Sequence, residues 1–433
     1  MFFIAASTSA DSVPTVAATI SAESCRPSAT AQENLPHFGD TCHETAGTDV
    51  ARMKFYYFHL MPYVMEHDEP SSWVTLSNRF YDPKVGQTLY HQYLDQLEYA
   101  EALGWDGLCV NEHHQNCYGT MPSPNVMAAM LVRRTSRAKI AILGNGLPLR
   151  ENPLRIAEEI AMLDVASGGR VISGFVRGIS AEYFSTGSNP THSRERFYEA
   201  AELILRAWTE PGPFPFDGKY YRYHYVNPWP RPLQKPHPPV WCPSQGSSET
   251  VEWASKRRFP YLMVFTPIKR IAQIYGEYRE ACQRHGYTAS RYQLTVNVPI
   301  VVAENDAKAA EIAKKNTMWV FNTGLRMHPP FWRPPGYMTE ASLRRMLQNP
   351  PPLPSELTFE QADREGYIVY GSPATVRDKL RVFSDELKAG IVCSGMNGGS
   401  HEATLEMMQL FSEEVMPDFR EDAEVDETAG VGR

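Results

Sequence analysis

Short apolar segments alternate with longer amphipathic ones along most of this chain, and this alternation is the feature that most restricts its fold. An apolar run of about four to eight residues between turn residues is typical of a buried strand. Segment 85–103, which Gly104 ends, instead has an apolar residue every three or four positions, as a helix with one buried face does. Strands are predicted on this basis at 54–60, 107–110, 139–143, 170–176 and 239–243.

Strands that alternate with helices form a parallel sheet covered on both faces, so the pattern predicts an α/β fold. Units near 260–286 and 292–315, with a last strand at 390–393, bring the number of strand–helix units to eight. Eight units favour a closed (β/α)8 TIM barrel over an open doubly wound sheet. We therefore predict a single barrel domain over 53–420, with its active site at the C-terminal ends of the strands.

Two Pro-rich insertions, near 210–238 and 322–366, interrupt the alternation. The first is also rich in Tyr and Trp, which indicates an ordered insertion rather than a linker. We expect it to cover the barrel mouth and to shape a substrate pocket with Tyr221, Tyr223 and Trp229. A passively packed loop or a dimer contact is the alternative.

The two ends of the chain lack this pattern. Residues 1–52 are rich in Ser, Thr and Ala and show no period, which predicts a disordered N-terminal extension. Residues 421–433 are interpreted as a flexible C-terminal tail.

Composition excludes several classes of function. The net charge of -8 and the lack of a basic run argue against a nucleic-acid partner. No run of 18 apolar residues occurs, so we expect no transmembrane helix. The seven cysteines are scattered, without a C-x-x-C pair, and no H-E-x-x-H spacing occurs, so no metal site is predicted. Reduced thiols suit a cytoplasmic enzyme.

Polar residues follow the second predicted strand, where the barrel mouth should lie. The run Asn111-Glu112-His113-His114 could supply a general acid or base, because the pKa of histidine lies near working pH. A structural histidine, hydrogen-bonded into the rim, is the equally weighted alternative.

The next strands are followed by residues suited to an anion. Arg177 follows the fourth strand, and its guanidinium could bind a phosphate or pair with an acid such as Glu182. Ser247 and Thr250 stand at the start of a predicted helix, where free N–H groups attract anions or where Ser simply caps the helix. The glycines of 144–146, after the third strand, allow close approach to a flat ligand or form a plain turn.

These residues together resemble the bacterial luciferase-like family of flavin-dependent monooxygenases, over about residues 54–420. The order of seven segments along the chain matches that of the family. The segments concerned are Glu112–His114, Asn152–Glu159, Met162–Asp164, Ser167–Arg170, Gly174–Gly178, Thr250–Ala254 and Gly371–Pro373.

The resemblance implies an enzyme that takes reduced FMN from a separate flavin reductase. It implies that O2 adds to the flavin as a peroxide, and that one oxygen atom passes to a small, apolar organic substrate. It further implies a homodimer. His113, with Glu112 and His114, matches the catalytic residues of the family. The cofactor-binding residues that it implies are Asn145, where the backbone passes the flavin ring and a non-proline cis peptide is common, and Arg177, Gly246, Ser247 and Thr250 around the phosphate.

Two positions depart from the luciferase pattern. Val176 stands where the luciferase alpha chain has a reactive cysteine, and Gly246 stands where it has a carboxylate. The first departure argues against light emission more than against oxygenation. Two alternatives stay open: an F420-dependent oxidoreductase on the same barrel, and a non-catalytic flavin-binding partner subunit.

Overall fold

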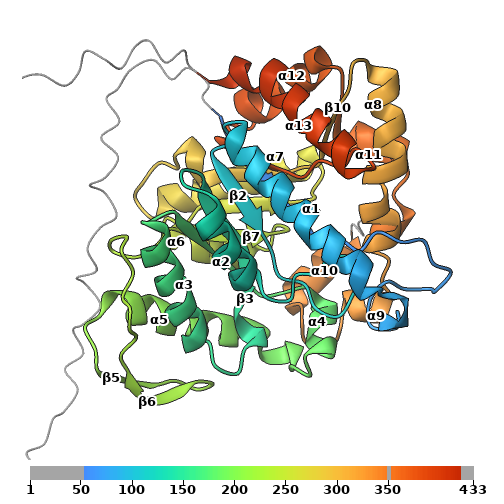
Figure 1. The fold of residues 1–433 in the computed structure, drawn as a ribbon. Helices are drawn as coiled ribbons and strands as arrows, with labels where there is room; N and C mark the ends of the chain where they lie inside the picture. The colour runs from blue at the N-terminus through green and yellow to red at the C-terminus, as the bar shows by residue number, and fades with distance from the viewer. Residues whose placement is uncertain (1–52, 349–352, 421–433) are drawn as a thin grey trace, which may run out of the picture. The chain divides into compact units, whose positions relative to one another are not determined.

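The computed structural model describes residues 53–348 and 353–420, and the predicted terminal segments 1–52 and 421–433 lie outside these ranges. Eight parallel strands close into a barrel in the order β1-β12-β9-β8-β7-β4-β3-β2. This confirms the predicted (β/α)8 barrel (Figure 1). The strands are β1 Lys54–Phe58, β2 Gly107–Val110, β3 Lys139–Gly146, β4 Val171–Val176, β7 Val240–Ser244, β8 Tyr261–Val264, β9 Leu294–Asn297 and β12 Ile391–Ser394.

Helices connect these strands and cover the outside of the barrel. α5 illustrates why they form, because its period of three to four residues buries Phe197, Ala201, Ile204 and Trp208 on one face. The main helices are α1 Pro83–Ala102, α2 Pro124–Arg134, α3 Leu154–Ser167, α5 Ser193–Thr209, α6 Ser248–Lys256, α7 Ile268–Arg284, α12 Pro373–Arg381 and α13 His401–Glu414. None of the described helices is both long enough and apolar enough to cross a membrane.

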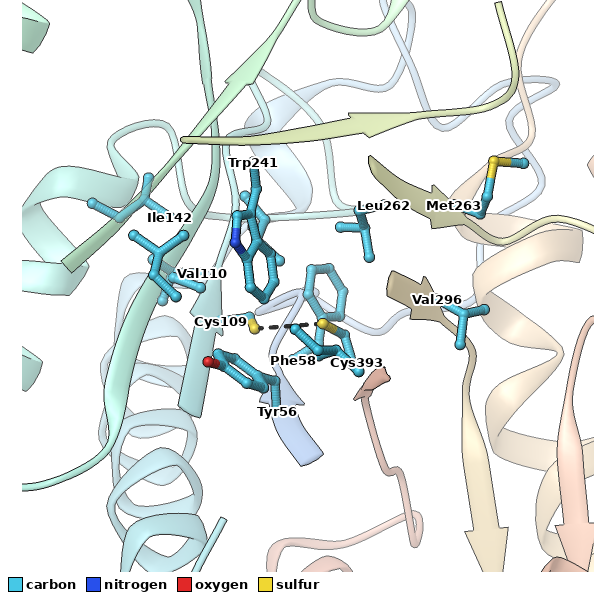
Figure 2. Packing of buried hydrophobic residues seen from close by; sticks show 14 of the residues in the cluster. Tyr56, Phe58, Cys109, Val110, Ile142, Trp241, Leu262, Met263, Val296 and Cys393 are labelled. Carbon is cyan, nitrogen blue, oxygen red and sulfur yellow. Dashed lines mark hydrogen bonds between the residues drawn. The ribbon is translucent and has the colours of Figure 1, made fainter. Parts of the chain in front are cut away.

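The barrel interior is a packed core rather than a channel (Figure 2). Tyr56 and Trp241 meet across it with ring centroids 5.2 Å apart. Cys109 and Cys393 are buried thiols with their Sγ atoms 4.0 Å apart. Since β2 and β12 are not neighbouring strands, this contact shows that both side chains point into the barrel.

The segment Ser167–Arg170, which resembles the family, has a structural role through Arg170, just before β4. Its Nη2 donates to the carbonyl oxygens of Val132 and Thr135, at 3.1 and 3.0 Å. Its Nε donates to the carbonyl oxygen of Ser167 at 3.1 Å. These carbonyls lie at the ends of α2 and α3, where a cation satisfies unpaired acceptors. Arg170 therefore holds two helix ends against the barrel.

The third strand is longer than predicted. β3 continues through Gly146, with an irregular register between Ile142 and Asn145, so the glycines expected in a turn belong to the strand. Gly144 and Gly174 face each other so closely that a Cβ on Gly144 would lie 2.4 Å from the Gly174 carbonyl oxygen. Only glycine fits this crossing of β3 and β4.

The first insertion is ordered, as predicted, but it does not cover the barrel mouth. Its hairpin, β5 Phe214–Asp217 and β6 Arg222–Val226, contacts the outer side of α5, where Glu199 accepts bonds from the backbone of Tyr220 and Tyr221. Trp229 is 84% exposed, which contradicts its predicted place in a substrate pocket. Tyr223 donates its hydroxyl hydrogen to Oδ1 of Asn152, at the start of α3, at 2.8 Å.

The second insertion reaches the barrel mouth instead. It contains α9 Pro329–Trp332, α10 Glu340–Gln348 and α11 Phe359–Glu365. Ser180, after β4, donates to the carbonyl oxygens of Phe331 and Trp332 at 2.6 and 2.8 Å. Thr339 donates to Glu249, in the first turn of α6, at 2.9 Å. Residues 331–339 therefore lie over the ends of β4 and β7.

Candidate active site

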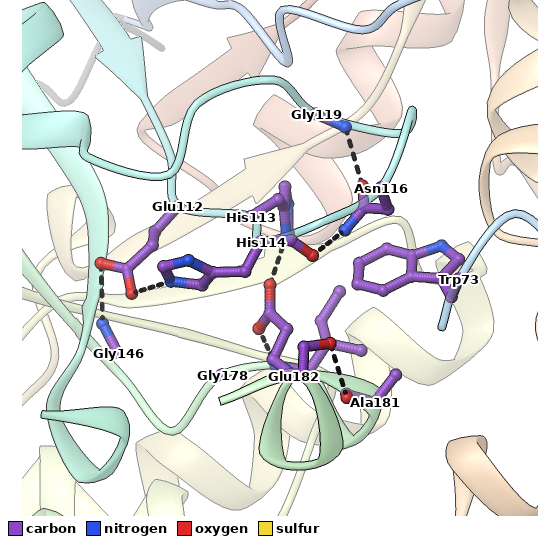
Figure 3. A network of polar contacts seen from close by, with 12 residues as sticks. Trp73, Glu112, His113, His114, Asn116, Gly119, Gly146, Gly178, Ala181 and Glu182 are labelled. Atoms are coloured by element: carbon purple, nitrogen blue, oxygen red, sulfur yellow. Dashed lines mark hydrogen bonds and ion pairs between the residues drawn. The ribbon is translucent and has the colours of Figure 1, made fainter. Parts of the chain in front are cut away.

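His113 lies at the C-terminal end of β2 and is held by a buried carboxylate (Figure 3). Its Nδ1 lies 3.1 Å from Oε1 of Glu182, whose side chain is only 2% exposed. The other oxygen, Oε2, accepts the Ile179 N–H at 2.7 Å. Glu182 belongs to α4, Ser180–Ser185, which directly follows the Arg177-Gly178 turn. The Glu182 carboxylate thus fixes the orientation of the His113 ring through Nδ1. The other ring nitrogen, Nε2, has no carboxylate partner among the described residues.

Two aromatic rings complete the surroundings of His113. The Tyr118 and Trp73 ring centroids lie 4.8 and 5.8 Å from that of the histidine, both edge-on. Trp73 donates its Nε1 hydrogen to the carbonyl oxygen of Gly324 at 2.7 Å, which connects this wall to the start of the second insertion. A histidine oriented by a carboxylate among apolar rings is suited to transfer a proton.

Glu112 and His114 turn the other way and form a separate ion-pair cluster. Glu112 binds His114 Nε2 at 2.8 Å and Arg150 Nη2 at 2.5 Å. It also accepts the Gly146 N–H, at 3.4 Å. Burial alone would lower the pKa of His114, but the hydrogen bond and charge of Glu112 outweigh it and raise that pKa. The predicted triplet is therefore divided between two neighbouring clusters.

Arg177 lies at the end of β4, as predicted, but it does not pair with Glu182. Its Nη1 donates to Ser193 Oγ at 3.1 Å and to the Tyr337 carbonyl oxygen at 3.2 Å. The guanidinium stacks over the Tyr337 ring at 4.3 Å. Within the described residues its Nε and Nη2 have no hydrogen-bond acceptor, so they are available to an anion.

Gly246, Ser247 and Thr250 lie at the end of β7, the strand next to β4. Gly246 has a φ of +92°, a conformation that favours glycine, and it leads into α6. Ser247 caps the helix by accepting the Thr250 N–H at 3.3 Å. Ser247 and Thr250 thus present their hydroxyls, and α6 its N-terminus, beside the end of β4, which Arg177 follows. Among the described residues no direct bond joins them to Arg177.

The Asn145 side chain points away from the mouth. Its Nδ2 donates to Asn125 Oδ1, on α2, at 3.2 Å, and the residue is fully buried. Its Oδ1 is buried and has no hydrogen-bond partner among the described residues. The cis peptide expected near Asn145 occurs between Leu143 and Gly144.

Sequence reasoning missed the roles of Glu182 and Tyr337. Glu182 was weighed only as a partner for Arg177, and Tyr337 lies far along the chain in a Pro-rich segment. The aromatic residues of 328–337 could have indicated that this segment packs against the barrel and is not an extended linker. Among the described residues, no group of three or more His, Cys, Asp or Glu side chains could hold a metal ion.

Comparison with known proteins defines the class. A family model described as luciferase-like monooxygenase matches residues 70–387. The chain belongs to the luciferase-like monooxygenase family.

Two relatives show how far the similarity extends. The uncharacterized protein y4wF of Sinorhizobium fredii is 36% identical over 176 residues, which are 39% of this chain and 50% of that protein. The alkanal monooxygenase alpha chain of Photorhabdus luminescens is 24% identical over 359 residues, 78% of this chain and 94% of that one. The chain therefore spans only half the length of the first relative and almost all of the second.

Solved structures share the fold. The oxygenating constituent of 3,6-diketocamphane monooxygenase from Pseudomonas putida, a type II Baeyer-Villiger monooxygenase in complex with FMN, superposes with a TM-score of 0.65 at 20% identity, covering 85% of this chain and 99% of that one. An F420-dependent secondary alcohol dehydrogenase superposes with a TM-score of 0.61 at 16% identity, covering 86% and 100%.

Proposed function

We propose that this protein is a two-component flavin-dependent monooxygenase. It takes reduced FMN from a separate flavin reductase and, with O2, inserts one oxygen atom into a small, apolar organic substrate. The observation that supports this most directly is the buried His113–Glu182 pair, at the barrel end where Arg177 and the start of α6 also lie. Membership of the luciferase-like monooxygenase family gives the reaction class.

The donor groups between β4 and β7 fit the phosphate of FMN. Arg177 keeps Nε and Nη2 free of acceptors among the described residues, and a planar guanidinium binds phosphate through two parallel hydrogen bonds. The first turn of α6 adds backbone N–H groups and the hydroxyls of Ser247 and Thr250. Glu249, in the same turn, is engaged by Arg194 at 3.7 Å and by Thr339, which offsets its charge.

His113 then acts on protons beside the flavin ring. Reduced FMN supplies the two electrons that activate O2. Glu182 accepts a hydrogen bond from Nδ1–H of His113, so that Nε2 is the nitrogen able to accept or donate a proton. Trp73 and Tyr118 exclude water from the ring. The Glu112–His114–Arg150 cluster stabilises the loop after β2 that carries His113. It makes no hydrogen bond to Glu182 among the described residues.

The shared fold of the F420-dependent dehydrogenase keeps hydride transfer as the rival activity. Among the described residues, no contact of His113 favours hydride transfer over oxygenation. A test of which cofactor the protein binds, FMN or F420, therefore separates the two activities.

Replacement of Arg177 tests the cofactor site. We expect Arg177→Ala to weaken FMN binding by roughly 1.5–3 kcal/mol, about 10- to 150-fold in Kd, the scale of hydrogen bonds to a charged group. Flavin fluorescence titration measures it. Arg222→Ala, on the exposed hairpin strand β6, is the matched control and should bind FMN normally. Unchanged affinity of the Arg177 variant would remove this residue from the site.

A further inference from the structure

Asn297, the last residue of β9, is a buried polar side chain without a partner. It is 2% exposed, and neither its Oδ1 nor its Nδ2 has a hydrogen bond within the described residues. An unpaired buried donor or acceptor costs about 1–3 kcal/mol, so two on one side chain call for an occupant that satisfies both.

The side chain points into the barrel. Asn297 is in register with Cys393, and register partners on neighbouring parallel strands face the same side. Cys393 meets Cys109 in the interior (Figure 2). Two residues earlier on the same face of β9, Thr295 is fully buried with its Oγ1 also unpaired. β9 thus offers a polar stripe that ends at the mouth.

The position of β9 in the barrel separates Asn297 from the cofactor groups. In the strand order, β9 and β3 stand four strands apart in either direction and are therefore directly opposite. Under the proposed function the backbone of β3 would hold the flavin ring, and His113 follows β2, the strand beside it. Asn297 would then lie across the barrel from the flavin-binding strand, where a substrate could approach.

We infer that Asn297 is a substrate-binding residue that selects neutral molecules with a carbonyl group beside an N–H, such as lactams and carboxamides. A carboxamide with both atoms free is complementary to another amide edge, because it donates from Nδ2 to the carbonyl oxygen and accepts the N–H at Oδ1. Its register partners, Val264 and Cys393, carry no charge, so a carboxylate would find no counter-ion among them. This inference rests on the proposed function for the place of the flavin.

Three compounds with one bicyclic skeleton test the inference: oxindole, 2-indanone and indane. Their binding to the full chain loaded with oxidised FMN is measured by calorimetry, without turnover. We expect affinity to fall in that order, by about 3- to 10-fold at each lost hydrogen bond. Asn297→Leu, similar in size but apolar, should make the three bind alike. Asn297→Val is the second variant if the leucine variant does not fold, and Asn227→Leu on the surface hairpin should keep the wild-type order.

Three results would overturn it. If the three compounds bind alike to the wild-type protein, or if their order survives in both Asn297 variants, the side chain holds only a buried water. If the Asn297 variants instead weaken FMN binding, the amide contacts the cofactor. Oxygen incorporation is measured separately, so a preserved binding order without oxygenation would leave this inference standing while the proposed function failed.

Discussion

Two adjacent histidines in this site differ because their carboxylate partners differ. His113 pairs with Glu182 from α4, while His114 pairs with Glu112 in its own loop. A pair made within one loop stabilises that loop, whereas a pair made across two strand ends orients a side chain toward the mouth. We therefore expect His113, rather than His114, to transfer protons during turnover.

Loss of the Glu182 charge should impair catalysis without impairing cofactor binding. We expect Glu182→Gln to lower kcat by about 10- to 100-fold and to shift the pH profile of kcat, because the uncharged amide cannot accept from both the His113 Nδ1–H and the Ile179 N–H. FMN affinity should stay unchanged. Steady-state kinetics across pH measures both.

The matched control is Glu151→Gln, an exposed carboxylate beside Arg150. Equal rates and pH profiles for the Glu182 variant and this control would mean that the His113–Glu182 pair has no part in turnover.

For single residues, the sequence predicts where a side chain lies in the barrel better than it predicts the hydrogen-bond partner of that side chain. The polar residues after β2, β4 and β7 lie at the barrel mouth as expected, because a strand's end is a local property. The partner of Glu182 could not be predicted, since it depends on how α4 turns after Gly178, whose φ is +83°.

At the level of elements, the two insertions show why similar compositions have different roles. Both are rich in Pro and aromatic residues, yet the first lies along α5 and the second over the ends of β4 and β7. Long-range contacts decide this difference, and no local pattern reports them. The barrel strands and helices were predictable because their periods and turn residues are local.

The contact between the end of β1 and α1 contains a pH-sensitive group. Buried His59 receives the Met61 N–H on Nδ1 and contacts Gln96 through Nε2, both at 2.9 Å. Burial lowers its pKa to about 4, against the opposing effect of the hydrogen bond that Nε2–H donates to Gln96 Oε1. The neutral ring is therefore required in the folded state.

Stability should consequently fall as the pH drops from about 6.5 to about 4, because in that range the unfolded chain binds a proton at His59 and the folded chain does not. The contribution is about 3 kcal/mol when complete. Urea unfolding at a series of pH values should show a shallower decline for His59→Asn, and the wild-type decline for His91→Asn on the exposed side of α1. An unchanged slope in the His59 variant would contradict this assignment.

For the whole molecule, the count of eight strand–helix units favoured a closed barrel over an open sheet, and the structure confirms the closure. The number of strand–helix units does not predict which surface of the barrel binds another protein molecule. The structure shows exposed apolar side chains on the neighbouring helices α2 and α3, which are Val126, Met130, Met162 and Val165.

We expect these helices to form the interface of the homodimer that the sequence predicted, because contiguous exposed apolar residues are typical of association surfaces. Light scattering after size exclusion should give a dimer for the wild type and a monomer for Met130→Glu combined with Met162→Glu. Val85→Glu, an exposed apolar position on α1, should leave the dimer intact. A monomeric wild type, or a double variant that still dimerises, would exclude this surface.

The central claim, oxygen insertion with reduced FMN, is tested most directly with ¹⁸O2. The full chain is incubated with FMN, NADH, a generic flavin reductase and a panel of small neutral compounds, and the products are analysed by mass spectrometry. We predict a product that carries a single ¹⁸O atom and requires the reductase, FMN and O2 together. Substrate reduction by reduced F420 without O2, and no labelled product with FMN, would contradict the account.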